Sequence, residues 1–176
     1  MKSLLRIFGF SSARQRGFTL LLAALVASIV LSLGASIYEI AQKEVQLSSL
    51  GRDSQFAFYA ADTAAECALY WDFRYSYFGT STPSNPAAQN PTCDSQPLGA
   101  TGRSANFPYT MTSGQMNLFS DTTAGGGYCT VVAVQKTLDP TTQAVRTLIH
   151  ADGYNVSCAT ITTAPQALQR SVELHY

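Results

Sequence analysis

Apolar residues dominate the first part of the chain and then give way to a mixed pattern. The segment 18–38, FTLLLAALVASIVLSLGASIY, contains no charged residue. As a helix its 21 residues would extend about 32 Å, which matches a bilayer hydrocarbon core of about 30 Å. A helix is the form in which a single segment crosses a bilayer with its backbone hydrogen bonds satisfied. The pattern therefore predicts a transmembrane helix over 18–38.

Helix signals continue beyond this segment. No proline occurs from Tyr38 to Trp71, and Ala, Leu, Glu and Gln are frequent there. Apolar residues at three- and four-residue steps define one predicted face: Phe56, Ala60, Ala64, Cys67 and Trp71. The opposite face carries Asp53, Asp62, Glu66 and Arg74. We predict one long helix over 18–78, whose amphipathic second half packs on a sheet.

The remainder of the chain predicts a loop followed by strands. Residues 79–108 hold five of the seven prolines and are rich in Ser, Thr, Asn and Gly, which is typical of a long loop. Strand-like runs cover 129–136 and 145–152, with a turn at 139–142 between them, and 168–176 alternates as a closing strand. A further short strand is expected at Tyr109. The predicted fold class is therefore α+β, with the long N-terminal helix packed on a small antiparallel sheet formed by 109–176.

Charge around the apolar segment predicts its orientation. Four basic residues and no acid precede it, whereas Glu39 is the first charge after it: the basic residues are Lys2, Arg6, Arg14 and Arg16. The positive-inside rule places the basic leader 1–17 in the cytoplasm and the C-terminal part outside. A cleaved secretory signal would have an apolar core of about 7–15 residues and an A-x-A-like site. This segment is longer and lacks such a site, although hydropathy alone leaves a plain membrane anchor open.

Overall composition bears on the partners. Charged residues make up 12% of the chain, about half of the usual quarter, and the formal net charge is zero. Removal of residues 1–17 would leave seven basic and eleven acidic residues, a net charge of −4. Nucleic-acid binding needs clustered Lys and Arg. No nucleic-acid partner is therefore expected.

The junction before the apolar segment has a recognisable form. It consists of a basic residue, a glycine and a phenylalanine that opens the apolar run, in the order Arg16-Gly17-Phe18. This resembles the prepilin peptidase site of type IV pilins and type II secretion pseudopilins. Glycine suits a protease cleft, because it accepts extended or strained backbone conformations. The resemblance implies cleavage after Gly17, methylation of the new amino group on Phe18, and retention of the apolar helix for assembly.

Two further positions refine the resemblance. The fifth residue after Gly17 is Leu22, where most major pilins carry a glutamate that is thought to pair with a neighbour's N-terminal amine. A charge in lipid is costly unless it is paired, so its absence suggests a different role in assembly. Members of the family that lack this glutamate include minor pilins and tip pseudopilins, so the resemblance favours a minor component. The helix beyond the membrane is similar to the D-x-x-x-A-x-x-A-A-E run of PilX-type minor pilins. That run is filled here by Asp53, Ala57, Ala60, Ala61 and Asp62, with Asp62 in place of the glutamate.

The four cysteines, Cys67, Cys93, Cys129 and Cys158, all fall outside the membrane in this topology. Their spacing contains no C-x-x-C pair, which disfavours zinc and thioredoxin-like sites. An even number in an oxidising compartment favours disulfides, and the sequence leaves three pairings open. We favour Cys129–Cys158, because these residues bracket the predicted hairpin and antiparallel pairing returns the chain towards residue 129. Cys67–Cys93 would then tie the loop to the end of the helix.

Catalytic chemistry finds little support. His150 and His175 are the only histidines, and each lies in a strand-like run. There is no nucleophile motif, phosphate loop or carboxylate pair with a plausible partner, so we expect neither an enzyme nor a cofactor or metal site. Aromatic residues gather at 73–78, where core or subunit contacts are favoured over a patch for cell adhesion.

These features together indicate a minor pilin of a type IV pilus-like filament. The resemblance implies the inner membrane, prepilin peptidase and other pilin subunits as partners, and an extracellular location once assembled. Two alternatives stay open. One is a type II secretion pseudopilin, which shares the same N-terminus. The other is an unprocessed, membrane-anchored extracytoplasmic binding domain.

Overall fold

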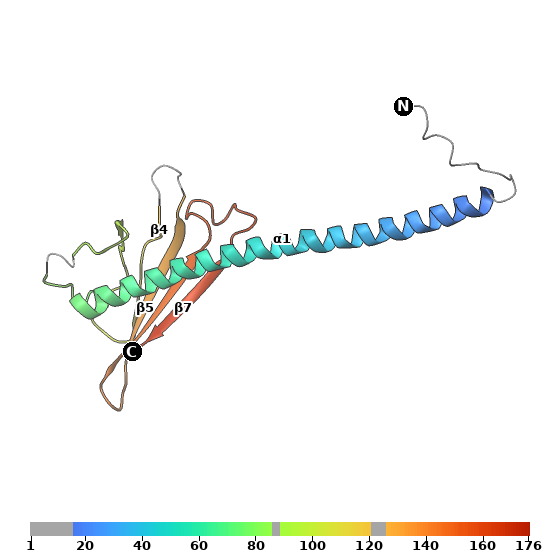
Figure 1. Cartoon of the computed structure of the whole chain (residues 1–176). Coiled ribbons are helices and arrows are strands. Elements are labelled where there is room, and N and C mark those ends of the chain that lie inside the picture. The colour runs from blue at the N-terminus through green and yellow to red at the C-terminus, as the bar shows by residue number, and fades with distance from the viewer. Residues whose placement is uncertain (1–15, 86–88, 121–125) are drawn as a thin grey trace. The chain divides into compact units, whose positions relative to one another are not determined.

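Helix α1 runs from Arg16 to Tyr75 (Figure 1). The computed structural model describes residues 16–85, 89–120 and 126–176. The chain forms two compact units, which meet between residues 48 and 49. The helix ends three residues before the predicted boundary at 78, because Ser76 adopts a left-handed backbone with a φ of 52°. The N–H of Tyr77 then donates to the carbonyl of Trp71, which closes the helix with a capping bond.

Two sheets follow the helix, and all of their strand pairs are antiparallel. The strands are β1 (Thr92–Cys93), β2 (Gln96–Pro97), β3 (Tyr109–Thr112), β4 (Met116–Leu118), β5 (Tyr128–Leu138), β6 (Val145–Tyr154) and β7 (Gln169–His175). Strands β1 and β2 form a small hairpin, and the larger sheet has the order β3-β5-β6-β7. Strand β4 also pairs with β5, opposite residues 128–130, whereas β3 lies opposite residues 133–136. The predicted α+β class is confirmed.

The runs at 129–136, 145–152 and 168–176 correspond to β5, β6 and β7, and the strand expected at Tyr109 is β3. The hairpin β1–β2 and strand β4 were not predicted. Strands of two or three residues are too short to produce an alternating pattern. The disulfide between Cys93 of β1 and Cys67 of α1 links this hairpin to the helix.

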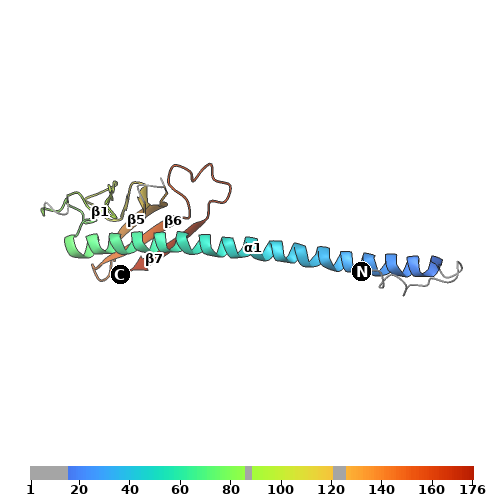
Figure 2. The ribbon, with the colours of Figure 1, turned by 45° about the horizontal axis from the view of Figure 1, so that its top comes forward.

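Residues 49–75 of α1 lie along one face of the larger sheet (Figures 1 and 2). The buried face of this part of the helix is a row of alanines: Ala57, Ala60, Ala61, Ala64, Ala65 and Ala68. Small side chains let the helix backbone approach the sheet closely. A Cβ atom at Gly153 of β6 would lie 2.3 Å from the carbonyl oxygen of Ala57 and 2.4 Å from the nitrogen of Ala61. Only glycine therefore fits beneath the helix at this point.

The alanine row corrects the predicted apolar face. Ala60 and Ala64 are buried as predicted, and Cys67 and Trp71 are half-buried. Phe56 instead lies at the margin, 38% exposed, and stacks on Tyr128 of β5 at 5.2 Å between ring centroids. A large ring does not fit where the backbones approach this closely.

The sheet covers the alanine row with alternate side chains of its strands. Residues that face the helix are apolar and buried: Met111, Met116, Leu118, Val132, Val134, Ile149 and Ala151. Between them, Gln135, His150 and Asp152 point to the other face, in keeping with the period of two. The core of the unit 49–176 therefore lies between this part of α1 and the sheet.

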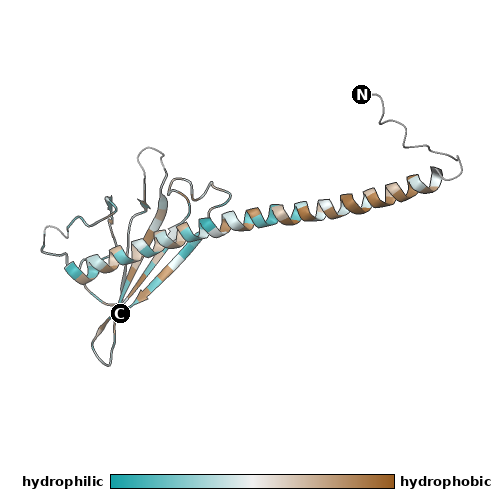
Figure 3. Ribbon diagram, viewed as in Figure 1, coloured by the Kyte–Doolittle hydropathy of each residue, from teal (hydrophilic) through white to brown (hydrophobic). Residues whose placement is uncertain are grey.

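The first part of α1 differs in composition. Figure 3 shows hydrophobic colours along the N-terminal half of the helix and mixed colours in its second half and in the strands. Every residue from 18 to 38 is exposed, including the large side chains of Leu20, Leu21, Ile29 and Leu31.

Candidate functional site

The predicted processing junction lies in the first turn of α1. Gly17 is exposed, and beyond its own turn of helix no atom of the described residues lies within 4 Å of the position that a Cβ would take. Phe18 is 72% exposed. The first N–H groups of a helix lack partners within the helix, so this turn opens more easily than the rest. Residues 1–15 of the predicted leader, including Lys2, Arg6 and Arg14, lie outside the described residues.

Three serines of the apolar segment form hydrogen bonds within the helix. The hydroxyls of Ser28, Ser32 and Ser36 donate to the carbonyls of Leu25, Ile29 and Ser32, three or four residues earlier in the helix. Leu22, the fifth residue after Gly17, is 51% exposed. Among the described residues, α1 is the one helix that is long and apolar enough to span a bilayer. These three hydroxyls therefore have hydrogen-bond partners within the helix itself.

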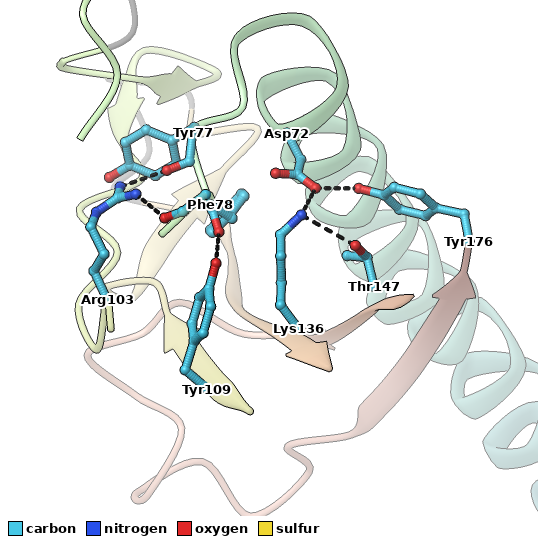
Figure 4. A network of polar contacts seen from close by, with 9 residues as sticks. Asp72, Tyr77, Phe78, Arg103, Tyr109, Lys136, Thr147 and Tyr176 are labelled. Carbon is cyan, nitrogen blue, oxygen red and sulfur yellow. Dashed lines mark hydrogen bonds and ion pairs between the residues drawn. The ribbon is translucent and has the colours of Figure 1, made fainter. Parts of the chain in front are cut away.

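A buried ion pair joins the end of α1 to the sheet (Figure 4). Asp72 of α1 and Lys136 of β5 lie with Oδ2 and Nζ 2.5 Å apart, and both side chains are largely buried. Lys136 also donates to Thr147 of β6 at 3.2 Å. The hydroxyl of Tyr176 donates to the same carboxylate oxygen at 2.5 Å. Burial and this hydrogen bond to the carboxylate raise the pKa of Tyr176, so it remains a donor at neutral pH.

A second polar cluster fixes the chain directly after the helix (Figure 4). The guanidinium of Arg103 donates to the carbonyls of Tyr77, Gly79 and Ser81, and it lies 5.6 Å from the centre of the Tyr77 ring. The hydroxyl of Tyr109 donates to the carbonyl of Phe78 at 2.7 Å. Burial, together with the nearby Asp72 carboxylate, raises the pKa of Tyr109. The Phe78 carbonyl and the Asp72–Lys136 pair lie in the interior, where these contacts supply their partners.

Both favoured disulfides are present. Cys67–Cys93 joins α1 to β1, and Cys129–Cys158 joins β5 to the loop after β6. The bridged residues are 26 and 29 positions apart, so each bridge is worth about 3–4 kcal/mol in the chain-entropy model. The indole of Trp71 adds a hydrogen bond to the carbonyl of Thr92 at 3.1 Å beside the first bridge.

The two histidines lie on the solvent face of the sheet. His150 of β6 contacts Glu173 through Nδ1 at 3.0 Å and Asp152 through Nε2 at 3.2 Å. The hydrogen bond to Glu173, together with the negative charge of Asp152, raises the pKa of His150. Burial lowers this pKa, but by less than the two carboxylates together raise it. His175 lies 3.7 Å from the other oxygen of Glu173. Within residues 16–85, 89–120 and 126–176, no group of three or more His, Cys, Asp or Glu is arranged to hold a metal ion.

The aromatic residues at 73–78 separate into two sets. Tyr77 and Phe78 belong to the core. Phe73 is 85% exposed, and Tyr75 is half-buried against Trp71. The first pair follows the prediction of core contacts, and Phe73 is left for an external contact.

Sequence reasoning missed the Asp72–Lys136 pair, although the sequence contains a signal for it. Asp72 follows Ala68 at a four-residue step, so it continues the buried face. Lys136 occupies the next inward position of β5 after Val132 and Val134. An acid on a buried helix face and a lysine on the inward face of a strand together indicate an internal ion pair.

Comparisons with protein-family models, with curated proteins and with solved structures find no match for this chain.

Proposed function

We propose that this chain is a minor subunit of a type IV pilus-like filament, processed after Gly17 and assembled through its apolar N-terminal helix. One observation carries the proposal. The uncharged segment 18–38 begins directly after Arg16-Gly17, and the helix that contains it continues to Tyr75. The later part of that helix packs on an antiparallel sheet. A protein built in this way keeps its apolar segment as part of its structure.

The distribution of charges and cysteines supports the orientation. The four basic residues before the apolar segment favour a cytoplasmic N-terminus. Both disulfides belong to residues after the segment, and disulfides persist in oxidising compartments outside the cytoplasm. In the proposed mechanism the apolar helix is stored in the membrane and then packs against like helices in the filament. Residues 49–176 face solvent or neighbouring subunits.

Leu22 supports the assignment to the minor class. Without a carboxylate at this position, the subunit supplies no charge partner to a neighbour's N-terminal amine. Burying an unpaired amine costs free energy unless it is neutralised. The protein should therefore occur in few copies, at the tip or as a priming subunit, beside a major pilin that has the glutamate.

Processing is tested with a glycine variant and a matched control. Gly17→Val should leave the full-length precursor in the membrane, seen as a slower band on a denaturing gel. Gly34→Val is the control, because neither glycine has an atom within 4 Å of its Cβ position, and it should be processed normally. A wild-type chain that is never shortened in cells with prepilin peptidase would contradict the proposal and favour a plain anchor.

Copy number tests the minor class separately. Quantitative mass spectrometry of sheared filaments should find this chain at a small fraction of the major pilin. Leu22→Glu should raise its share, whereas Leu21→Glu should not, because the carboxylate is then displaced around the helix. A chain that is the most abundant species, or that forms fibres alone, would refute the minor assignment. A processed chain that is absent from surface filaments would favour the secretion pseudopilin.

A further inference from the structure

Strand β7 has one free edge. Within the described part of the chain it is the terminal strand of its sheet and pairs with β6 alone. Thr147 and Tyr176 exchange both backbone hydrogen bonds, so in this antiparallel register the even-numbered residues of β7 bond to β6. The N–H and C=O groups of the odd-numbered residues therefore point away from the sheet. Ser171, Glu173 and His175 carry this open backbone edge.

A hollow lies beside the same edge, on the side that faces α1. It has a volume of about 670 Å³, and its lining comes from α1 and from the end of β7: Glu66, Leu69, Tyr70, Phe73, Leu174, His175 and Tyr176. Most of this lining is apolar or aromatic. The hollow and the open edge are adjacent, because Leu174 lines the hollow and its neighbours Glu173 and His175 carry the free backbone groups.

One charge in this hollow lacks a counterion among the described residues. Glu66 forms no ion pair with any Lys, Arg or His among the described residues, and it is exposed at the rim. In contrast, Glu173 on the solvent face contacts His150 at 3.0 Å. A basic group that entered the hollow would therefore meet an unpaired carboxylate beside apolar side chains.

We propose that this edge binds an extended segment of a partner protein, which adds to the sheet beside β7. The free backbone groups are complementary to an extended strand, and alternate side chains of such a strand point to the same face. The side chains on the side of α1 would enter the hollow. One of them would be a lysine or arginine opposite Glu66, and the others would be apolar. This inference does not depend on cleavage at Gly17 or on filament assembly.

A second copy of β7 is disfavoured as the occupant. Two identical edges pair about a two-fold axis and run antiparallel. Residues 49–75 of α1 in the two copies would then run in opposite directions, whereas chains anchored in one membrane share a direction. Alternatively, the charged side chains at this edge could serve only to prevent pairing with another chain, as charges on edge strands commonly do. The experiment below separates these cases.

The probe is a synthetic peptide of about eight residues, the length of an ordinary strand. It alternates threonine and valine, and one valine is replaced by lysine. The full chain in lipid nanodiscs is titrated with this peptide, and amide hydrogen exchange is followed residue by residue. Exchange at Ser171, Glu173 and His175 should slow at least about tenfold, equivalent to about 1.4 kcal/mol. Val172 and Leu174, already bonded to β6, should change little.

Variants test the backbone and the charge separately. Glu173→Pro removes an outward N–H without removing a bond to β6, and it should abolish binding, whereas Glu173→Ala should retain it. Glu66→Lys should weaken the lysine peptide at least about tenfold and should bind a peptide with glutamate at that place instead. Phe73→Ser should weaken binding, and Tyr59→Ser is its control, because Tyr59 is exposed on α1 but does not line the hollow.

Several outcomes would overturn the proposal. Absence of any protection at the odd-numbered residues would show that the edge is merely protected by its charges. Equal binding to Glu173→Pro and Glu173→Ala would show that the backbone edge is not used. Dimerisation of the chain through β7 in place of peptide binding would make a second copy the occupant.

Discussion

Two stretches of one helix differ in whether their apolar residues are exposed or buried. Residues 18–38 are uncharged and include ten Leu, Val or Ile side chains, and every residue of this stretch is exposed. Residues 57–68 present small alanines, and that face is fully buried against the sheet. Both stretches are helical, so helix propensity does not distinguish them.

The difference indicates where each stretch finds its partner. Alanine permits close approach of the helix to the sheet, and at Gly153 the two backbones are too close for even a Cβ atom to fit between them. The second stretch is therefore complementary to a surface within the same chain. Large exposed apolar residues favour contact with a partner, and the described part of this chain leaves these side chains uncovered. For residues 18–38 we propose that lipid fills this role first and other helices later.

The largest expected effect is at the ion pair that ends the buried stretch. Asp72→Ala leaves Lys136 buried without its partner, and it should reduce the free energy of unfolding by about 3–5 kcal/mol. Urea unfolding followed by the fluorescence of Trp71, the single tryptophan, measures the loss. The double variant Asp72→Ala/Lys136→Met should recover most of it. Equal stability of the single variant and the wild type would show that the pair does not hold the helix end.

The next effect tests the close approach of helix and sheet. Gly153→Ala places a methyl group against the backbone of Ala57 and Ala61, and it should cost about 1–3 kcal/mol in the same unfolding experiment. Gly114→Ala is the control, because nothing lies within 4 Å of its Cβ position. If both variants unfold alike, the alanine row does not set the helix–sheet distance.

A smaller effect concerns the turn that joins β5 and β6. Hydrogen bonds from the N–H groups of Thr141 and Thr142, then from Arg146, lower the pKa of Asp139 from 3.8 to about 2. A lowered pKa stabilises the folded state above the unfolded pKa, and the effect disappears as pH falls through the folded value. Asp139→Asn should therefore be less stable than the wild type above about pH 4 and equal to it near pH 2. A difference that stays constant across this range would contradict the assignment.

The smallest effect is expected in the exposed stretch. Leu25 is half exposed, so Leu25→Ala should change the unfolding free energy of residues 49–176 by no more than about 0.5 kcal/mol. The matched change in the buried stretch, Ala61→Leu, should be clearly destabilising because Ala61 is fully buried. A large effect of Leu25→Ala on Trp71 fluorescence unfolding would mean that the two stretches are not independent.

Regular patterns made much of the fold predictable. The uncharged segment, the absence of proline through Trp71 and the alternation of the last strands predicted the helix and strands β5, β6 and β7. The hairpin geometry also favoured Cys129–Cys158. These features repeat over many residues, so the signal accumulates.

Close packing explains what was missed. Hydrophobicity alone placed Phe56 on the buried face, whereas the close contact at Gly153 allows only small side chains, as at Ala57 and Ala61. Asp72 was not assigned to the interior, because its burial depends on Lys136, which is 64 positions away in sequence. The free edge of β7 was equally hidden, since it depends on the order of strands in the sheet.

The central claim is that the apolar stretch becomes the N-terminus of the working protein. Mass spectrometry of the chain purified from its native membrane or filaments tests this most directly. The account predicts that the sequence begins at Phe18 and that its amino group carries a methyl group. A native chain that still begins at Met1 would contradict it.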